Sequence, residues 1–145
     1  DKGYITSIKE AFTKYLGRDG PAHVKWQKMT PMQVVELIQR VNGLPVLAHP
    51  LTINDLETMV IELKAVGLVG IEAYYNGYTA SEVSRLVSLA DRHNLITTGG
   101  SDYHGLDPGT ETKIGGNDVP IEAAERLIAL AEQRALKLAN PYLPD

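Results

Sequence analysis

Two side chains that bind metals in proteins, Asp102 and His104, lie two positions apart in the segment Gly-Gly-Ser-Asp-Tyr-His-Gly at 99–105. The segment follows a predicted strand. In extended backbone, residues two apart point to the same face, so this carboxylate and imidazole can converge on one point. Such a pair suits Zn²⁺, Mn²⁺ or Fe²⁺, and the flanking glycines allow a close backbone approach to a ligand. The spacing predicts a metal site, although a helix-capping Asp and a surface His would give the same letters.

Strands and helices alternate along the chain. Short apolar runs predict strands at 44–48, 70–75 and 95–100. Apolar residues at helical spacing predict helices at 7–16, 31–41, 79–93 and 121–137. A further helix is predicted to begin at a cap, either Thr52 or Asn54, and to end at residue 66. Strands that alternate with helices in this way predict an α/β fold with right-handed βαβ units and a parallel sheet, either open or part of a barrel. We expect residues 1–145 to form a single domain.

The helix predicted at 31–41 has clear start and stop signals. Thr30 is a suitable N-cap, Pro31 suits the first helical position, and Asn-Gly at 42–43 ends the pattern. Its inward face is expected to consist of Val34, Val35, Ile38 and Val41.

Polar side chains follow each predicted strand near its carboxyl end. His49 follows the first strand, Glu72 and Tyr75 lie late in the second, and the Asp102/His104 pair follows the third. Parallel α/β folds bind ligands at this edge, whether the sheet is open or closed. The order of these residues predicts one shared metal or phosphate site.

Composition excludes several classes of site. The chain of 145 residues has no cysteine, so any metal must be held by His, Asp, Glu, backbone carbonyls or water. A net charge of −4 argues against a broadly basic nucleic-acid surface but allows a small anion to bind locally. No apolar run reaches the ~20 residues that a membrane helix needs, and the expected location is the cytoplasm.

Two segments resemble a known family. Val-Leu-Ala-His-Pro at 46–50 and Gly-Ser-Asp-Tyr-His-Gly at 100–105 are similar to the last two motifs of the PHP (polymerase and histidinol phosphatase) metal-dependent phosphoesterases. Segments 10–24 and 70–75 resemble the branch that includes nucleoside 3′,5′-bisphosphate phosphatases and the RNA 5′-end exonuclease ribonuclease AM. The resemblance implies the second half of a distorted (β/α)₇ barrel.

The early motifs of that family are not found here in their usual order. Its members begin with H-x-H and continue with a D-H-D-like segment and a glutamate, whereas Gly-Ile-Glu at 70–72 follows His49 instead of preceding it. We therefore expect a C-terminal portion that lacks the amino-terminal half of the barrel. An exposed strand edge and a bare apolar face would favour self-association.

The resemblance implies roles for particular residues. His49, Asp102 and His104 would be metal ligands, in a complete domain with up to three divalent ions, whether Mn, Zn, Fe or Mg. Asp102 and His104 would also be catalytic, and His104 could instead contact the phosphate or protonate the leaving oxygen.

The remaining candidates are expected to contact the substrate. Ser101 and the backbone of Gly100 would orient the ligand loop or donate to a phosphate oxygen. Glu72 would either orient a metal ligand or simply bond to the next turn. Tyr75 is expected mainly as a wall of the substrate pocket.

The expected function is hydrolysis of phosphate esters, of small nucleotides or RNA 5′ ends, by metal-activated water. This chain alone is expected to have little or no activity, because it supplies ligands from one side only. The alternative is a non-catalytic PHP-derived half-domain used for assembly. An amidohydrolase acting on C–N bonds shares strand-end His and Asp ligands but fits the Gly-Ser-Asp-Tyr-His-Gly context less well.

Overall fold

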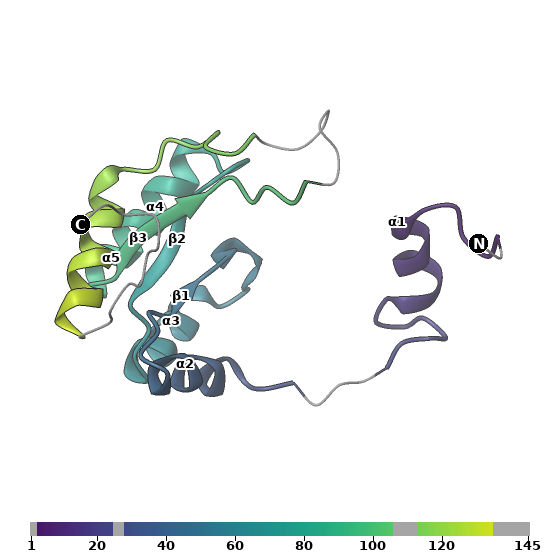
Figure 1. The fold of residues 1–145 in the computed structure, drawn as a ribbon, viewed down its shortest axis with the longest axis horizontal. Helices are drawn as coiled ribbons and strands as arrows, with labels where there is room; N and C mark the ends of the chain where they lie inside the picture. Colours follow the sequence, from purple (N-terminus) through teal and green to yellow (C-terminus); the bar gives the residue numbers. More distant parts are fainter. Residues whose placement is uncertain (1–2, 25–27, 106–112, 135–145) are drawn as a thin grey trace, which may run out of the picture.

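Three parallel strands form the centre of the fold in the computed structural model, which describes residues 3–24, 28–105 and 113–134. Within these residues the sheet consists of β1 (Val46–Leu47), β2 (Gly70–Tyr75) and β3 (Ile96–Gly100), in the spatial order β1-β2-β3 (Figure 1). The predicted α/β class with parallel strands is confirmed. Strands that follow one another in space as in sequence are arranged like successive strands of a (β/α) barrel.

Helices connect the strands, as predicted. The longer ones are α2 (Pro31–Arg40), α3 (Leu56–Ala65), α4 (Ala80–Arg92) and α5 (Ile121–Gln133). The short ones are α1 (Ile8–Ala11), the π-helical turn η1 (Phe12–Leu16) and the 3₁₀ turn η2 (Pro50–Thr52). The last three positions of the helix predicted at 121–137 lie outside the described residues.

Side-chain caps fix where the helices begin. Thr30 and Thr79 each accept a bond from the backbone three residues later, in reciprocal capping boxes with Gln33 and Glu82. The predicted cap of α3 was wrong, because Asp55 caps this helix by accepting a bond from the Thr58 backbone N–H at 3.4 Å. Thr52 instead lies in η2 and donates its hydroxyl to the His49 carbonyl at 2.7 Å.

The core lies between the sheet and the helices α3 and α4. It contains Ile71 and Ala73 from β2, together with the buried side chains Val60, Leu63, Leu68, Leu86, Leu89, Ala90 and Leu95. Ile71 and Ala73 are two residues apart and therefore share the face of β2 that meets the helices. Glu72 lies between them and points to the opposite face of the sheet.

The predicted inward face of α2 is only partly correct. Val35 is buried, but Val34 and Val41 are exposed, Val41 to 70%. Ile38 is half-buried. The helix packs against α3, and this contact covers only part of the predicted face. The end of the helix was correctly located, and Asn42 adopts the left-handed conformation (φ 60°) that often follows a helix.

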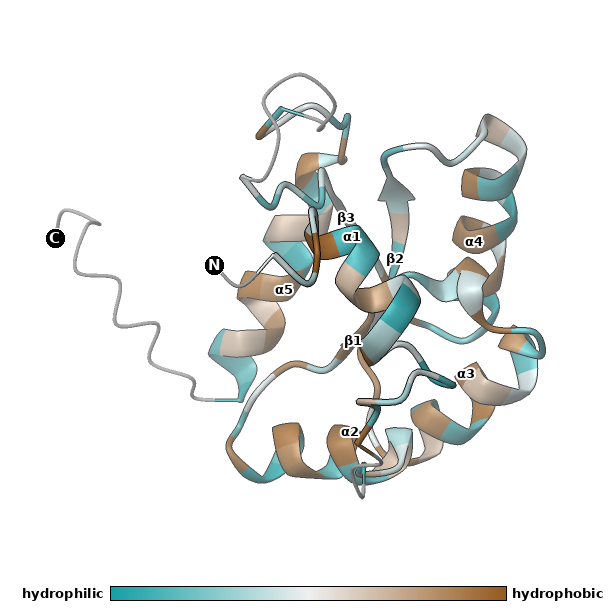
Figure 2. Cartoon of the chain, turned by 90° about the vertical axis from the view of Figure 1, so that its right-hand side faces the viewer, coloured by the Kyte–Doolittle hydropathy of each residue, from teal (hydrophilic) through white to brown (hydrophobic). Residues whose placement is uncertain are grey.

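The amino-terminal helices lie apart from the sheet. Figure 1 shows α1 and η1 as a separate small unit, and Figure 2 shows apolar residues on exposed turns of α1 and α2. Ile8 and Phe12 of this unit are exposed to 73% and 58%. That residues 1–145 form a single domain stays a prediction.

In the part of the chain that the structure describes, no helix combines the length and the apolar character needed to cross a membrane. The cytoplasmic location stays a prediction.

Candidate metal centre

His49 lies two residues beyond the end of β1 in an unusual backbone conformation. Its φ of 47° and ψ of 48° place it in the left-handed region, which costs free energy for a residue with a β-carbon. Two hydrogen bonds stabilise the conformation. The His49 backbone N–H donates to Glu72 Oε2 at 2.8 Å, and its carbonyl accepts the bond from Thr52 described above. Glu72 therefore orients the residue that carries a candidate ligand, one of the two roles predicted for it.

Asp102 and His104 lie beyond β3, and their geometry differs from the predicted one. The strand ends at Gly100, and Asp102 is left-handed (φ 52°), so the two side chains do not meet through extended backbone. They meet because the chain turns back: His104 Nδ1 lies 2.6 Å from the Asp102 carbonyl oxygen. A carbonyl only accepts hydrogen bonds, so Nδ1 is the donor, and in the neutral imidazole this leaves the lone pair on Nε2.

The three predicted metal ligands lie close together, with one Asp102 oxygen near both histidines. Asp102 Oδ1 lies 3.9 Å from His49 Nε2 and 3.8 Å from His104 Nε2. Donors around a tetrahedral ion with bonds of ~2.1 Å are separated by about 3.4 Å, so these side chains would have to move closer by a few tenths of an ångström. In the described ranges, no group of three or more His, Asp or Glu is already arranged to hold an ion. The types of donor atom fit a divalent ion, and the distances between them are slightly longer than those around a bound ion.

Tyr75 completes this cluster. Its hydroxyl donates to Asp102 Oδ2 at 3.0 Å, and its ring meets the His49 ring edge-on with centroids 5.0 Å apart. The Tyr78 ring also packs against the Tyr75 ring, with centroids 5.0 Å apart. The hydrogen bond to Asp102 raises the pKa of Tyr75 above its usual value of about 10, so the phenol stays protonated at neutral pH. The sequence predicted a pocket wall, and the structure adds a bond to a candidate ligand.

A bulge in β2 explains why Tyr75 lies on this face. Glu72 pairs with Thr98 and Tyr74 pairs with Gly99, so the extra residue Ala73 breaks the alternation. Residues three apart then share one face, and both Glu72 and Tyr75 contact His49. The bulge also brings Gly99 so close to the Tyr74 carbonyl oxygen that a β-carbon at Gly99 would clash.

Asn117 is a further contact that the sequence did not reveal. Its side-chain amide donates to the Tyr74 carbonyl at 3.2 Å and to the Gly100 carbonyl, and so ties the ends of β2 and β3 together. The predicted substrate-contacting residues Gly100 and Ser101 are half-buried next to this contact. Their proposed contacts with a phosphate stay a prediction.

Replacing Tyr75 with Phe tests whether its hydroxyl positions Asp102. The change keeps the ring against His49 and removes only the hydrogen bond, so we expect about tenfold weaker binding of Mn²⁺. Titration calorimetry on the metal-free protein measures this affinity. Tyr15→Phe, in the distant η1 turn, makes the same chemical change and should leave the affinity as it was. Equal affinities for all three proteins would show that the hydroxyl has no such role.

Three named relatives match between 49% and 82% of the chain. It is 30% identical over 123 residues to a 3′,5′-nucleoside bisphosphate phosphatase from Chromobacterium violaceum, a match that covers 82% of this chain and 41% of that protein. It is 39% identical over 71 residues to a phosphoribosyl 1,2-cyclic phosphate 1,2-diphosphodiesterase from Eggerthella lenta (49% and 27%). It is 29% identical over 106 residues to a 5′-3′ exoribonuclease from Haemophilus influenzae (70% and 39%). All three names describe hydrolysis of phosphate esters.

Solved structures share the fold. A metal-dependent phosphoesterase from Bifidobacterium adolescentis superposes with a TM-score of 0.67 at 24% identity, over 84% of this chain and 44% of that one. A C. violaceum protein named as an amidohydrolase, with bound sulfate and no metal, gives a TM-score of 0.66 at 27% identity, over 88% and 46%. The chain is similar in sequence to phosphatases and exoribonucleases and in fold to a metal-dependent phosphoesterase. The predicted resemblance is thereby confirmed.

The chain spans less than half the length of these relatives, between 27% and 41% of the three matched by sequence. This partial coverage fits the prediction of a portion of the PHP domain. No family model matches the chain.

Proposed function

We propose that this chain supplies the carboxyl-terminal ligands of a metal-dependent phosphoesterase that acts on nucleotides or RNA 5′ ends. One observation carries the proposal: Asp102 Oδ1 lies between His49 Nε2 and His104 Nε2 at the carboxyl ends of β1 and β3. Ligands bind at this edge in parallel α/β folds. The named relatives, a nucleotide phosphatase, a cyclic phosphodiesterase and an exoribonuclease, support the class of substrate.

His49, Asp102 and His104 are the residues that would hold a divalent ion. Imidazole nitrogen with carboxylate oxygen suits Zn, Mn or Fe, and the choice of metal depends on availability. Such an ion would supply charge neutralisation of the phosphate oxygens and an activated water as nucleophile.

The neighbouring residues keep these donors in the required state. Tyr75 binds Oδ2 of Asp102 and so leaves Oδ1 facing the two histidines. The Asp102 carbonyl fixes the His104 tautomer, which exposes the Nε2 lone pair. Glu72 holds the backbone of His49 in place. Gly100 ends β3 and Ser101 follows it, and their polar groups would donate to a phosphate oxygen there.

Two other functions remain as outcomes of the test. A non-catalytic half-domain would assemble with a second copy or with an amino-terminal half of the barrel, covering the exposed apolar side chains of α1 and α2. An amidohydrolase would use the same donors on a C–N bond, and the name of one structural neighbour favours keeping this possibility in the test.

The experiment compares this chain with a longer protein that also contains the amino-terminal part spanned by the relatives. Both are incubated with Mn²⁺ and either adenosine 3′,5′-bisphosphate or a 5′-phosphorylated RNA oligonucleotide. We expect the longer protein to release phosphate or mononucleotides. The chain alone should have a kcat/KM at least about a hundredfold lower. Loss of a residue that only orients a metal ligand lowers activity about 10- to 100-fold, and loss of the ligands themselves should lower it further.

Each alternative gives a different result. Turnover by the chain alone that His49→Ala abolishes would show that the described residues suffice for a working site. A longer protein that cleaves amides but neither phosphate substrate would be an amidohydrolase. A longer protein without any activity, together with stable dimers of this chain in size-exclusion chromatography, would support the assembly role.

A further inference from the structure

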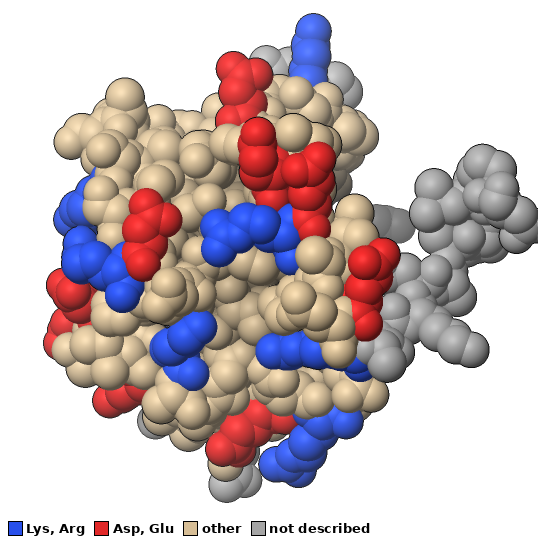
Figure 3. All heavy atoms as spheres, turned by 90° about the vertical axis from the view of Figure 1, so that its left-hand side faces the viewer, with Lys and Arg blue, Asp and Glu red and all other residues tan. Residues whose placement is uncertain are grey.

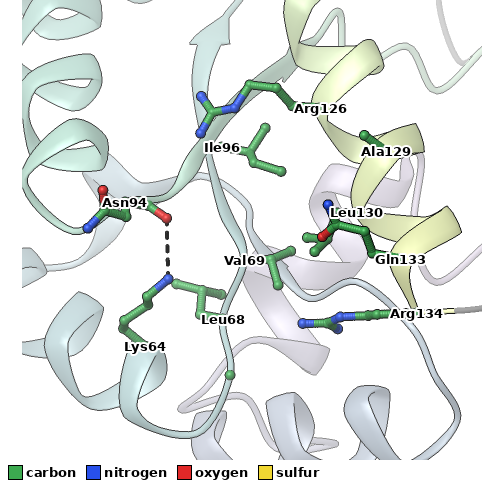
Figure 4. A pocket seen from close by; sticks show the side chains of 11 residues that line it. Lys64, Leu68, Val69, Asn94, Ile96, Arg126, Ala129, Leu130, Gln133 and Arg134 are labelled. Atoms are coloured by element: carbon green, nitrogen blue, oxygen red, sulfur yellow. Dashed lines mark hydrogen bonds between the residues drawn. The ribbon is translucent and has the colours of Figure 1, made fainter.

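A hollow in the protein surface lies at the opposite end of the sheet from the metal cluster. Its volume is about 420 Å³, a size typical of small-molecule sites. It opens beside Val69, directly before β2, and Ile96, the first residue of β3, and it is closed on one side by α5 (Figure 4). Its apolar floor includes Leu68, which is buried, and Leu130.

Three cations surround this hollow. Lys64 reaches it from α3, Arg126 from α5, and Arg134 from the position directly after α5 (Figure 4). Each is held by a neutral oxygen: Lys64 donates to the Asn94 carbonyl at 3.3 Å, Arg126 to the Leu95 carbonyl at 3.5 Å, and Arg134 to the Gly43 carbonyl at 3.2 Å. These bonds orient the three side chains and leave other N–H donors of each available.

No carboxylate lines the hollow or forms an ion pair with these cations among the described residues. The other polar lining residues, Asn94 and Gln133, carry amides that can also donate. Figure 3, which views the side that carries α5, shows several basic side chains near the middle of this face, with acidic side chains beside some of them. Such a local excess of positive charge in a chain of net charge −4 favours an anion.

We propose that the hollow between α3, α5 and the amino ends of β2 and β3 binds a small polyanion with two or more phosphate or carboxylate groups. A polyanion matches cations that approach from several sides, since each charged group can accept bonds from a different one. Guanidinium groups bind phosphate and carboxylate through the same paired geometry, so both chemistries fit. The site is separate from the His49/Asp102/His104 cluster and does not depend on its function.

Titration calorimetry on this chain in metal-free buffer with EDTA tests the proposal, with pyrophosphate and citrate as the two probes. We expect at least one of them to bind. Lys64→Gln and Arg126→Gln should each weaken this binding about tenfold, the size of one lost charge-assisted hydrogen bond. Circular dichroism confirms that the variants fold, and a higher melting temperature in the presence of the probe gives a second readout of binding.

Two control variants show whether a loss of probe binding is specific to this hollow. Arg85→Gln removes the same charge from α4, outside the hollow, and should change the affinity less than twofold. His49→Ala should also leave binding intact, because it alters only the metal cluster. Binding of neither probe, an equal loss in Arg85→Gln, or a loss in His49→Ala would each overturn the proposal. Binding of only one probe would identify the chemical class of the ligand.

Discussion

Asp102→Ala is expected to lower the kcat/KM of the longer protein for a phosphate ester at least about a thousandfold. Asp102 Oδ1 is the oxygen shared by His49 Nε2 and His104 Nε2, so its loss removes the centre of the proposed ligand set. Loss of an orienting partner alone costs 10- to 100-fold, and loss of a ligand should exceed this. Steady-state hydrolysis of adenosine 3′,5′-bisphosphate with Mn²⁺ gives the rate, and titration calorimetry gives the metal affinity.

The left-handed backbone at Asp102 requires a second variant. With φ at 52°, alanine is strained where Asp or Asn is tolerated, so Asp102→Ala changes both ligand and loop. Asp102→Asn keeps the conformation and the size and removes the negative charge. We expect it to lose nearly as much activity as the alanine variant. Asp91→Ala, at an exposed position of α4, should behave like the unchanged protein. An Asp102→Asn enzyme with full activity would limit Asp102 to a structural role.

The sequence located the elements because their signals are local. The bounds of β2 and the capping box of α4 follow from an apolar run and from Thr79 with Glu82 three residues later. The gathering of His49 and Asp102 could also be predicted, because parallel strands place their carboxyl ends at one edge. The resemblance to the PHP phosphoesterases could be recognised as well, because the two motifs that carry these residues are continuous in the sequence.

The details of the centre could not be predicted, because they depend on irregular backbone. A regular β2 would place Glu72 and Tyr75 on opposite faces, and only the bulge at Ala73 unites them. Nothing in the sequence marks this bulge. The left-handed conformations of His49 and Asp102 are likewise unmarked, since glycine is the usual signal for them. The exposure of Val34 and Val41 depends on how α2 packs against α3, which the periodicity of a single helix does not determine.

Glu72→Ala is expected to weaken Mn²⁺ binding 10- to 100-fold even though Glu72 is not a proposed ligand. Its Oε2 accepts the His49 N–H at 2.8 Å, and this bond helps to hold His49 in the left-handed region, which costs about 1–3 kcal/mol. Without it, the His49 ring is no longer fixed opposite Asp102. The half-buried N–H also loses its partner, so the free energy of unfolding should fall by about 1–3 kcal/mol.

Glu72→Gln separates these effects, because its amide oxygen can still accept the His49 N–H while the negative charge is gone. We expect this variant to recover most of the stability in urea denaturation and most of the metal affinity. Glu62→Ala, on the exposed side of α3, is the matched control and should change neither quantity. If Glu72→Gln is as impaired as Glu72→Ala, the charge of Glu72 acts directly on the metal and the backbone bond is secondary. If Glu72→Ala binds Mn²⁺ normally, the conformation of His49 is held by Pro50 and Thr52 alone.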